Sequence, residues 1–290
     1  MNDVSFMGRL KSQWEMDKFL TISVDPWPAL MPESATSVMD FLRKIIDATR
    51  DLCCCYQINP RFYYDHFGDS AHSRVRLVAE HMRQKAPLVP IIVDIKEADI
   101  SAAIACSARF WFEQMNFDAV TVCPFYGMDA FWPFLRHDNK GVVVNCRTSN
   151  PDAGEFQDLE VKENGGEPMP LHRFIAWRAS QHWNKVRNCA LTIDASHPED
   201  LGQTRSLITQ AGEPTIPIFI YGSGTQGTRD ALENISQSVS NGQDLQGRGF
   251  SIVVSRTVLY ASRGSNFADE ARASAIRLIE AIRQSRKSTA

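Results

Sequence analysis

Short apolar runs, rich in β-branched residues and followed by polar, glycine or proline residues, recur along the whole chain. Runs of this length without polar alternation are typical of strands buried on both faces. Eight such strands are predicted: Phe19–Val24, Cys53–Ile58, Val89–Ile95, Ala119–Val122, Gly141–Asn145, Cys189–Ile193, Ile216–Ile220 and Phe250–Val254. The pattern therefore predicts a sheet that is covered on both sides.

Segments between these runs carry the helical period, with apolar residues at i, i+3, i+4 and i+7. The clearest are Ser34–Asp51, Pro198–Ala211 and Ala268–Ser285. Strands that alternate with helices indicate a parallel sheet, because parallel neighbours need long crossovers. Eight strand–helix units would close a (β/α)8 TIM barrel as a single α/β domain over residues 1–290. A doubly wound open sheet is the alternative.

Composition is that of an ordinary globular protein, and it narrows the classes of function. The 290 residues carry 31 Lys and Arg against 34 Asp and Glu, which gives a net charge of −3. A protein that coats nucleic acid is normally basic, so we expect no nucleic-acid partner. No apolar run approaches the ~20 residues of a membrane-spanning helix, so we expect no membrane partner either.

The seven cysteines lack paired C-x-x-C spacing and lie mostly inside apolar runs. This favours reduced core thiols in a cytoplasmic protein over a disulfide or zinc framework. The histidines are scattered without metal-ligand spacing, so we expect no metal and no organic cofactor. His197, which follows the sixth predicted strand, is the histidine best placed to face a pocket.

Polar side chains at the carboxyl ends of barrel strands are the candidates for chemistry. The first strand is followed by Asp25, and the second ends around Gln57 and Asn59. The third strand is the most unusual, because Asp94 and Lys96 are two residues apart and share one face of an extended strand. Asp99 follows in the next turn. Charges that converge at a barrel mouth need partners, so this alternation predicts either a functional network or a structural salt-bridge cluster.

The last two strands end in a pattern typical of anion sites. The seventh runs into a glycine-rich turn over residues 221–227, and the eighth is followed by Ser255 and Arg256. In barrels, the loops after strands seven and eight commonly bind phosphate through backbone N–H groups. Arg256 adds a bidentate donor. A third region, Asp152–Pro170 after the fifth strand, is polar and glycine-rich, and is predicted as a long exposed loop.

These motifs resemble the orotidine 5'-phosphate decarboxylase family, in its longer bacterial and protozoan form, from about residue 19 to residue 261. The strongest element is the D-x-K-x-x-D-I pattern at residues 94–100. Supporting stretches lie at residues 24–26, 118–127, 146–151, 224–227 and 255–256, in the same order along the chain. The resemblance implies decarboxylation of orotidine 5'-monophosphate (OMP) to UMP.

The resemblance also implies roles for individual residues. Lys96 would protonate C6 of the pyrimidine as carbon dioxide leaves, with Asp94 holding Lys96. Asp99 would reach the neighbouring site across a homodimer interface. The implied substrate-binding residues are Asp25, Gln57, Asn59, Thr121, Ser149, Tyr221, Gly224, Gln226, Gly227, Ser255 and Arg256.

Departures from the family pattern are concentrated at the strand ends. The family usually has Lys where Gln57 stands, so the predicted site lacks one cation. The other departures are Ser101-Ala102-Ala103 after Ile100, Cys123 in place of Asn, Asp194 in place of Gly, and Tyr221 in place of Pro. They leave two alternatives open: a diverged paralogue acting on another pyrimidine or sugar phosphate, and a catalytically weak nucleotide-binding homologue.

Overall fold

Eight parallel strands close into a barrel in the computed structural model, which describes residues 3–163, 166–210, 216–222 and 231–286. The spatial order is β1-β10-β9-β8-β5-β4-β3-β2, so the first and last barrel strands pair and complete the ring. The strands are β1 (Leu20–Ser23), β2 (Cys55–Ile58), β3 (Ile91–Glu97), β4 (Ala119–Val122), β5 (Gly141–Asn145), β8 (Cys189–Asp194), β9 (Ile218–Tyr221) and β10 (Phe250–Val254). The predicted barrel is confirmed, and the open sheet is wrong.

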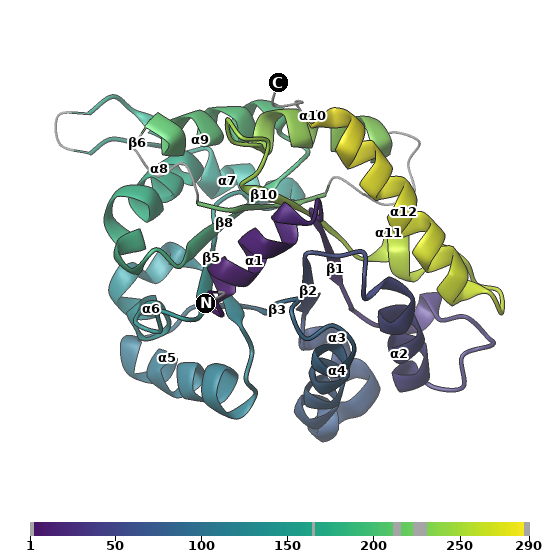
Figure 1. Cartoon of the computed structure of the whole chain (residues 1–290). Helices are drawn as coiled ribbons and strands as arrows, with labels where there is room; N and C mark the ends of the chain where they lie inside the picture. The colour runs from purple at the N-terminus through teal and green to yellow at the C-terminus, as the bar shows by residue number, and fades with distance from the viewer. Residues whose placement is uncertain (1–2, 164–165, 211–215, 223–230, 287–290) are drawn as a thin grey trace.

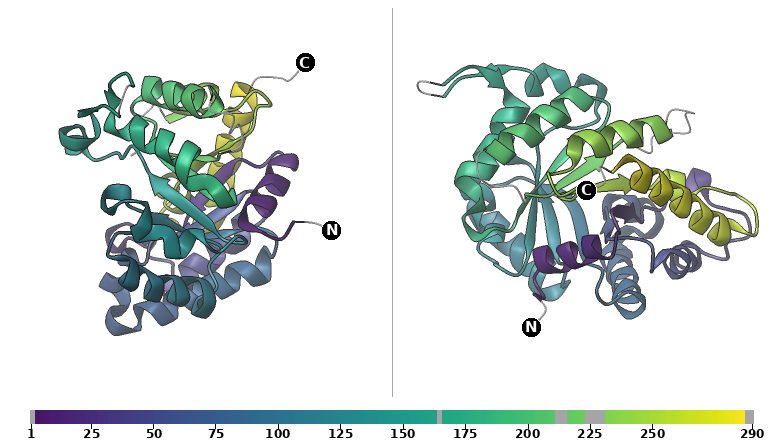
Figure 2. Two further views of the ribbon diagram at one scale, coloured as in Figure 1. Left: turned by 90° about the vertical axis from the view of Figure 1, so that its left-hand side faces the viewer. Right: turned by 45° about the horizontal axis from the view of Figure 1, so that its top comes forward.

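Helices between the strands pack around the outside of this ring (Figures 1 and 2). They are α2 (Val38–Thr49), α3 (Arg61–Phe67), α4 (Ala71–Lys85), α5 (Ser101–Ala108), α6 (Met128–Leu135), α8 (Leu171–Arg178), α9 (Pro198–Gln210), α10 (Ala231–Gly242), α11 (Arg256–Leu259) and α12 (Phe267–Ser285). The three helices predicted from periodicity are present as α2, α9 and α12, with shifted ends.

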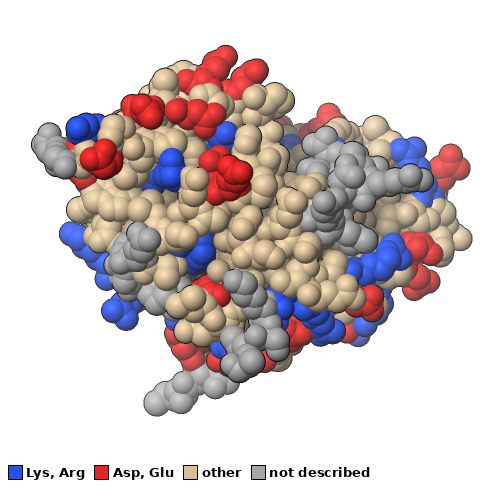
Figure 3. Space-filling view, turned by 90° about the horizontal axis from the view of Figure 1, so that it is seen from above, with Lys and Arg blue, Asp and Glu red and all other residues tan. Residues whose placement is uncertain are grey.

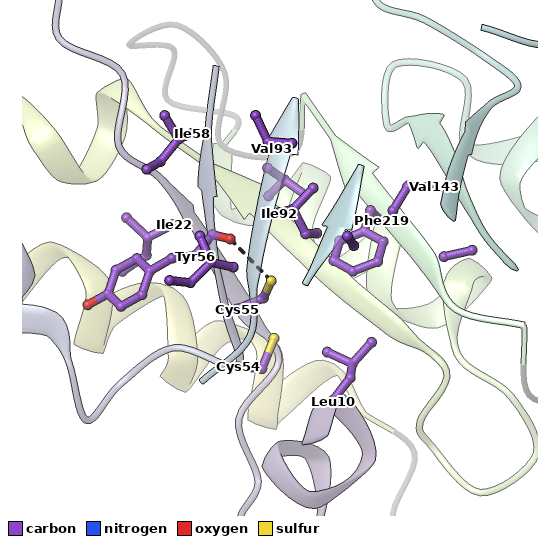
Figure 4. Packing of buried hydrophobic residues seen from close by; sticks show 14 of the residues in the cluster. Leu10, Ile22, Cys54, Cys55, Tyr56, Ile58, Ile92, Val93, Val143 and Phe219 are labelled. Carbon is purple, nitrogen blue, oxygen red and sulfur yellow. Dashed lines mark hydrogen bonds between the residues drawn. The ribbon is translucent and has the colours of Figure 1, made fainter. Parts of the chain in front are cut away.

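The start and inner face of α2 follow directly from its sequence. The Ser37 hydroxyl accepts a hydrogen bond of 3.1 Å from the Asp40 N–H, which satisfies a donor that the first helical turn leaves free. Phe41, Ile45 and Ile46 then face the barrel and are fully buried. On the inside of the barrel, Phe219 of β9 packs against Phe6 with ring centroids 6.4 Å apart. On the outside, Tyr56 of β2 packs against α2, with its hydroxyl 3.0 Å from Thr49 Oγ1; both Phe219 and Tyr56 are labelled in Figure 4.

An additional helix, α1 (Phe6–Glu15), covers the amino-terminal end of the barrel and was not predicted from the sequence. The Phe6 ring lies against Gly141, the first residue of β5, where even one added carbon would lie 2.3 Å from the ring. The Gln13 amide donates to the Leu88 carbonyl just before β3. Since α1 covers this end, the barrel interior opens to solvent at the carboxyl ends of the strands.

The segment predicted as a long loop, Asp152–Pro170, contains regular structure instead. It includes part of a short 3-10 helix (Pro151–Ala153), α7 (Gly154–Gln157), and the antiparallel pair β6 (Glu160–Val161) and β7 (Met169–Pro170). The described part of the segment is exposed or partly exposed throughout. Two-residue strands have too few positions to show an alternating pattern, so the sequence predicted the exposed loop without these short elements.

Buried thiols account for most of the cysteines. Cys53, Cys54, Cys55, Cys146 and Cys189 are buried, and none of the seven forms a disulfide. Cys106 is exposed and Cys123 is partly exposed, so the expectation of core thiols is wrong for these two. The cytoplasmic location stays a prediction.

Basic and acidic side chains are mixed over the face shown in Figure 3, without a continuous basic surface among the described residues. In the part of the chain that the structure describes, no helix combines the length and apolar character required to cross a membrane.

Candidate active site

A cavity of about 410 Å³ opens at the carboxyl ends of the barrel strands. This size is typical of sites for small molecules. The predicted site residues that line it are Asp25, Gln57, Asn59, Asp94, Lys96, Ser149, Tyr221, Ser255 and Arg256. Further lining residues were not predicted as site residues from the sequence, among them Ser23, Trp27, Phe62, Asn145, Arg147, Thr148, Asn150, Thr192, Gly222 and Thr257. Several of these residues directly follow a strand end, so the search for polar side chains at strand ends that selected Asp25 could also have found them.

Lys96 and Asp94 form an ion pair in this cavity. The Lys96 Nζ lies 2.5 Å from Asp94 Oδ2, with the carboxylate buried and the lysine side chain 44% exposed. Their meeting does not come from a regular strand, however. The pairing of β3 with β4 shifts register between Val93 and Glu97, and Lys96 has a left-handed backbone φ of 47°. Such a conformation is costly for a side-chain-bearing residue and needs support from its surroundings.

Thr121 on the neighbouring strand β4 supplies that support. Its hydroxyl accepts a hydrogen bond of 2.8 Å from the Lys96 N–H and donates one of 2.7 Å to Asp94 Oδ1. The side chain is fully buried and does not line the cavity. Thr121, predicted as a substrate-binding residue, is therefore placed beneath the pair and holds its geometry.

A chain of hydrogen bonds that ends on the Asp25 carboxyl crosses the cavity on the other side of Asp94. The Tyr221 hydroxyl donates to Gln57 Oε1 at 2.5 Å, and Gln57 Nε2 donates to the Ser23 hydroxyl at 3.2 Å. The Ser23 hydroxyl donates in turn to Asp25 Oδ2 at 2.7 Å. This Tyr221–Gln57–Ser23–Asp25 bridge joins β9, β2 and β1 without a cation.

Asp25 is nearly buried and has no cation in direct contact among the described residues. Desolvation by burial raises its pKa to about 7, against the lowering effect of the Ser23 hydroxyl and the Asn59 N–H, which donates at 2.9 Å. The Asn59 side chain also donates to Asp94 Oδ2 at 3.3 Å. Asn59 therefore links the two carboxylates of the site.

Among the described residues, three cationic side chains line the cavity, and they differ in their partners. Lys96 pairs with Asp94, and Arg147 pairs with Asp158 at 2.6 Å. Arg256 forms no ion pair with a described carboxylate; its guanidinium lies over the Trp27 ring, 5.2 Å from the ring centroid. Of these three, Arg256 is the cation left available for an anion. The predicted anion-site residues Gly224, Gln226 and Gly227 lie outside the described residues.

Arg147 belongs to a partly buried cluster of charged side chains that was not predicted from the sequence. Its guanidinium lies between Asp158 and Asp200, and His172 contacts the same two carboxylates at 3.7 and 3.5 Å. Burial lowers the pKa of His172, although its Nδ1–H donates to the Gln157 carbonyl. His197, the histidine expected near the pocket, contacts Arg147 at 3.3 Å.

The carboxylate and imidazole atoms of Asp158, His172 and Asp200 lie within 4.8 Å of one another, close enough in principle for a metal ion. The Arg147 guanidinium already contacts both carboxylates, however. A divalent cation there would have to displace a buried arginine. The arginine therefore balances the charge of the two carboxylates, and the cluster stabilises the loop after β5 that begins near Arg147.

Asp99 is the predicted catalytic residue that this chain does not bring to the cavity. It is exposed, and its carboxylate accepts a hydrogen bond of 2.7 Å from the Ile100 N–H. Within this chain Asp94 and Lys96 therefore meet, whereas Asp99 lies outside the cavity, and its predicted role in the neighbouring site stays a prediction.

Asp194, at the end of β8, lies behind the cavity wall. Its Oδ1 accepts hydrogen bonds from the Ser196 N–H and hydroxyl, and its Oδ2 has no hydrogen-bond partner among the described residues. Gly222 faces it with a φ of 83°, and a Cβ there would lie 2.4 Å from Oδ2. Both the backbone angle and the close approach require glycine at this position.

The chain is similar to curated proteins over nearly its full length. It is 34% identical over 288 residues to the orotidine 5'-phosphate decarboxylase of Cupriavidus metallidurans, covering 98% of this chain and 99% of that protein. It is 34% identical over 290 residues to the protein of the same name from Cellvibrio japonicus, covering 98% of this chain and all of that one.

A solved structure shares the architecture. The UMP synthase of Leishmania donovani superposes with a TM-score of 0.80 at 26% identity, over 96% of this chain and 56% of that longer one. No protein-family model matches the chain.

Proposed function

The chain belongs to the orotidine 5'-phosphate decarboxylase family, and we propose that it converts OMP to UMP with Lys96 as the proton donor. The observation that carries the proposal is the Lys96–Asp94 pair in the cavity, held by Thr121. The alternatives, a paralogue with another substrate or a weak binding homologue, are not favoured by relatives of this identity and coverage.

In the reaction, the bond between C6 and the carboxylate carbon breaks, and its electron pair stays on C6. Carbon dioxide leaves, the Lys96 ammonium gives a proton to C6, and water reprotonates the amine. A fixed ammonium beside the developing carbanion lowers the barrier, because its charge is already oriented. Asp94 holds the Lys96 ammonium in position, and its own carboxylate would lie beside the carboxylate of the substrate.

The remaining lining residues support binding of a nucleotide. Asp25 and Asn59 would contact the ribose, and Ser149 would contact the edge of the pyrimidine. Arg256 and Ser255 would bind the 5'-phosphate together with residues Gly224, Gln226 and Gly227. Tyr221 and Gln57 would form the wall beside the ribose. No metal or organic cofactor enters this chemistry.

Loss of the orotate absorbance of OMP, with formation of UMP, tests the proposal directly. We expect turnover by the wild type and a loss of roughly 100-fold or more in Lys96→Ala, because a general acid and a fixed charge are both removed. The Lys44→Ala variant is the matched control, since Lys44 forms a surface pair with Asp40 at 2.9 Å. A wild-type protein that binds UMP and leaves OMP unchanged would show that the decarboxylase assignment is wrong.

We also propose that the chain forms a homodimer in which Asp99 enters the neighbouring site. Next to Asp99, Ile100 is 65% exposed, and Phe125 and Tyr126 after β4 are 79% and 56% exposed. Because β3 and β4 are adjacent in the barrel, these residues flank one side of the site entrance. Exposed apolar side chains grouped beside a charged residue are typical of a surface that another copy covers.

Mixing two inactive variants tests the shared site. In a dimer of one Lys96→Ala chain and one Asp99→Ala chain, one site loses both residues and the other keeps both. Random exchange of subunits therefore restores about a quarter of wild-type activity if Asp99 acts across the interface. A mixture that stays inactive, or a wild type that sediments as a monomer, would contradict the homodimer while leaving the role of Lys96 intact.

A further inference from the structure

Trp27 and Arg256 meet where the barrel closes. Trp27 follows β1 and Arg256 follows β10, and these first and last strands pair in parallel. Trp27 is 39% exposed, lines the cavity, and places its ring beneath the Arg256 guanidinium, 5.2 Å from its centroid. A guanidinium over the face of a tryptophan is attracted by the ring electrons and keeps its N–H donors free at the edge.

Tyr260 fixes the turn that carries Trp27. The Tyr260 hydroxyl accepts a hydrogen bond of 2.5 Å from the Trp27 N–H and donates one of 3.3 Å to the Asp25 carbonyl. Its ring stacks on Phe41 of α2, with centroids 5.5 Å apart. Burial raises the pKa of Tyr260 to about 12, so the phenol stays protonated and able to donate. The turn from Asp25 to Trp27 is thereby tied to the residue that follows α11.

A second aromatic side chain helps to keep Trp27 in place. The Phe62 ring, from α3, lies against Trp27 with centroids 6.3 Å apart and also lines the cavity. Trp27 is therefore supported on one side by Phe62 and tied through its backbone to Tyr260. A flexible arginine over such a support loses less freedom on binding than one that extends into solvent.

We propose that Trp27 is a positioning residue that holds Arg256 ready for the phosphate of the nucleotide. The inference rests on the proposed function, in which Arg256 binds the 5'-phosphate. It adds that the preference of the site for a nucleotide over the nucleoside depends on an aromatic side chain that does not itself bind phosphate.

The test compares binding of UMP and of uridine by calorimetry, so that phosphate is the one difference between the ligands. Trp27→Leu is expected to weaken UMP binding by about 3- to 10-fold and to leave uridine within roughly 2-fold of the wild type. Trp27→Phe keeps an aromatic face and is expected to recover most of the lost UMP affinity. Trp177→Leu is the matched control, because Trp177 carries Arg178 in the same way at 5.9 Å, outside the cavity.

The Arg256→Ala background separates the inference from the proposed function. If Trp27 acts through Arg256, adding Trp27→Leu to Arg256→Ala causes no further loss of UMP affinity. Equal weakening of UMP and uridine by Trp27→Leu, or an undiminished effect in the Arg256→Ala background, would overturn the positioning role alone. If Arg256→Ala itself leaves the preference for UMP over uridine unchanged, the phosphate role of Arg256 fails, and the inference fails with it.

Discussion

The hydroxyl of Tyr221 reaches across the barrel mouth and donates a hydrogen bond of 2.5 Å to the side-chain oxygen of Gln57. Burial raises the pKa of Tyr221 well above its ordinary value, so the phenol is a neutral donor at neutral pH. The two residues that depart from the family pattern at this end of the site therefore form a pair. Tyr221 supplies the partner that Gln57 needs, and neither brings a charge.

Restoring a cation at this position is expected to speed the reaction. A lysine in Gln57→Lys would lie near the Asp25 and Asp94 carboxylates, and a charge-assisted hydrogen bond is roughly twice as strong as a neutral one. We expect kcat/KM for OMP to rise by roughly 10-fold in Gln57→Lys combined with Tyr221→Phe. The single Tyr221→Phe variant controls for loss of the phenol. An unchanged or lower kcat/KM would mean that the site works through the neutral bridge.

Removing the Thr121 hydroxyl is expected to impair catalysis as well as stability. Thr121→Val leaves the Lys96 N–H and one Asp94 oxygen without their buried partner, which costs about 1–3 kcal/mol of unfolding free energy. Thr21→Val is the control, because Thr21 is an equally buried barrel threonine that bonds Ser251 at 2.6 Å, away from the cavity. The free energy of unfolding, measured by urea denaturation, should fall in both variants, while kcat should fall only in Thr121→Val. If Thr121→Val and Thr21→Val had the same kcat, the role given to Thr121 would be contradicted.

Asp25 should make stability fall as pH rises. Its folded pKa of about 7 lies above the ordinary 3.8, so the native state binds the proton more tightly than the unfolded state does. The stabilising contribution of Asp25 to the free energy of unfolding is therefore fully present below about pH 4. It is lost progressively between about pH 4 and pH 7, and it does not change further above that range. Asp25→Asn cannot ionise and should be more stable than the wild type by about 2–4 kcal/mol at pH 8, and about equal at pH 4. Urea unfolding of the wild type and of Asp25→Asn between pH 4 and pH 8 measures these free energies of unfolding. If the two free energies changed in parallel with pH, the raised pKa of Asp25 would be contradicted.

Arg147 should matter for stability more than a surface arginine does. Arg147→Met removes a 4% exposed guanidinium from between Asp158 and Asp200, and leaves those carboxylates to repel each other. Because Asp158 is half exposed, we expect a moderate loss of about 1–3 kcal/mol. Arg178→Met, which breaks an exposed pair with Glu163, should cost less than about 1 kcal/mol. Similar losses in the two variants would show that the cluster is solvated.

Much of the barrel could be predicted because its strands are buried on both faces. The bounds of β4, β5 and β10 match the apolar runs residue for residue, since nothing but burial determines where those strands run. The hairpin of β6 and β7 could not be predicted, because two-residue strands carry no period. Helix α1 was missed because its role, covering the barrel end, depends on partners such as Gly141 far along the chain.

The site was predictable in its members and less so in its geometry. Alternation along β3 put Asp94 and Lys96 on one face, but the observed pair depends on a register shift and a positive φ at Lys96. That backbone angle is supported by Thr121, a contact from another strand that no local spacing encodes. The Arg147 cluster was missed for the same reason: its four members are brought together by loops and helices rather than by a motif.

The pairing of β1 with β10 has a consequence for how the protein is made. The turn that carries Asp25 and Trp27 is synthesised early, whereas Arg256 and Tyr260 follow the last barrel strand. A chain emerging from the ribosome therefore has no complete nucleotide site until its final strand has docked. A nucleotide that contacts both edges joins them, so it stabilises the closed ring by mass action against opening at this seam. Ligand binding thus reports on whether synthesis and closure are finished.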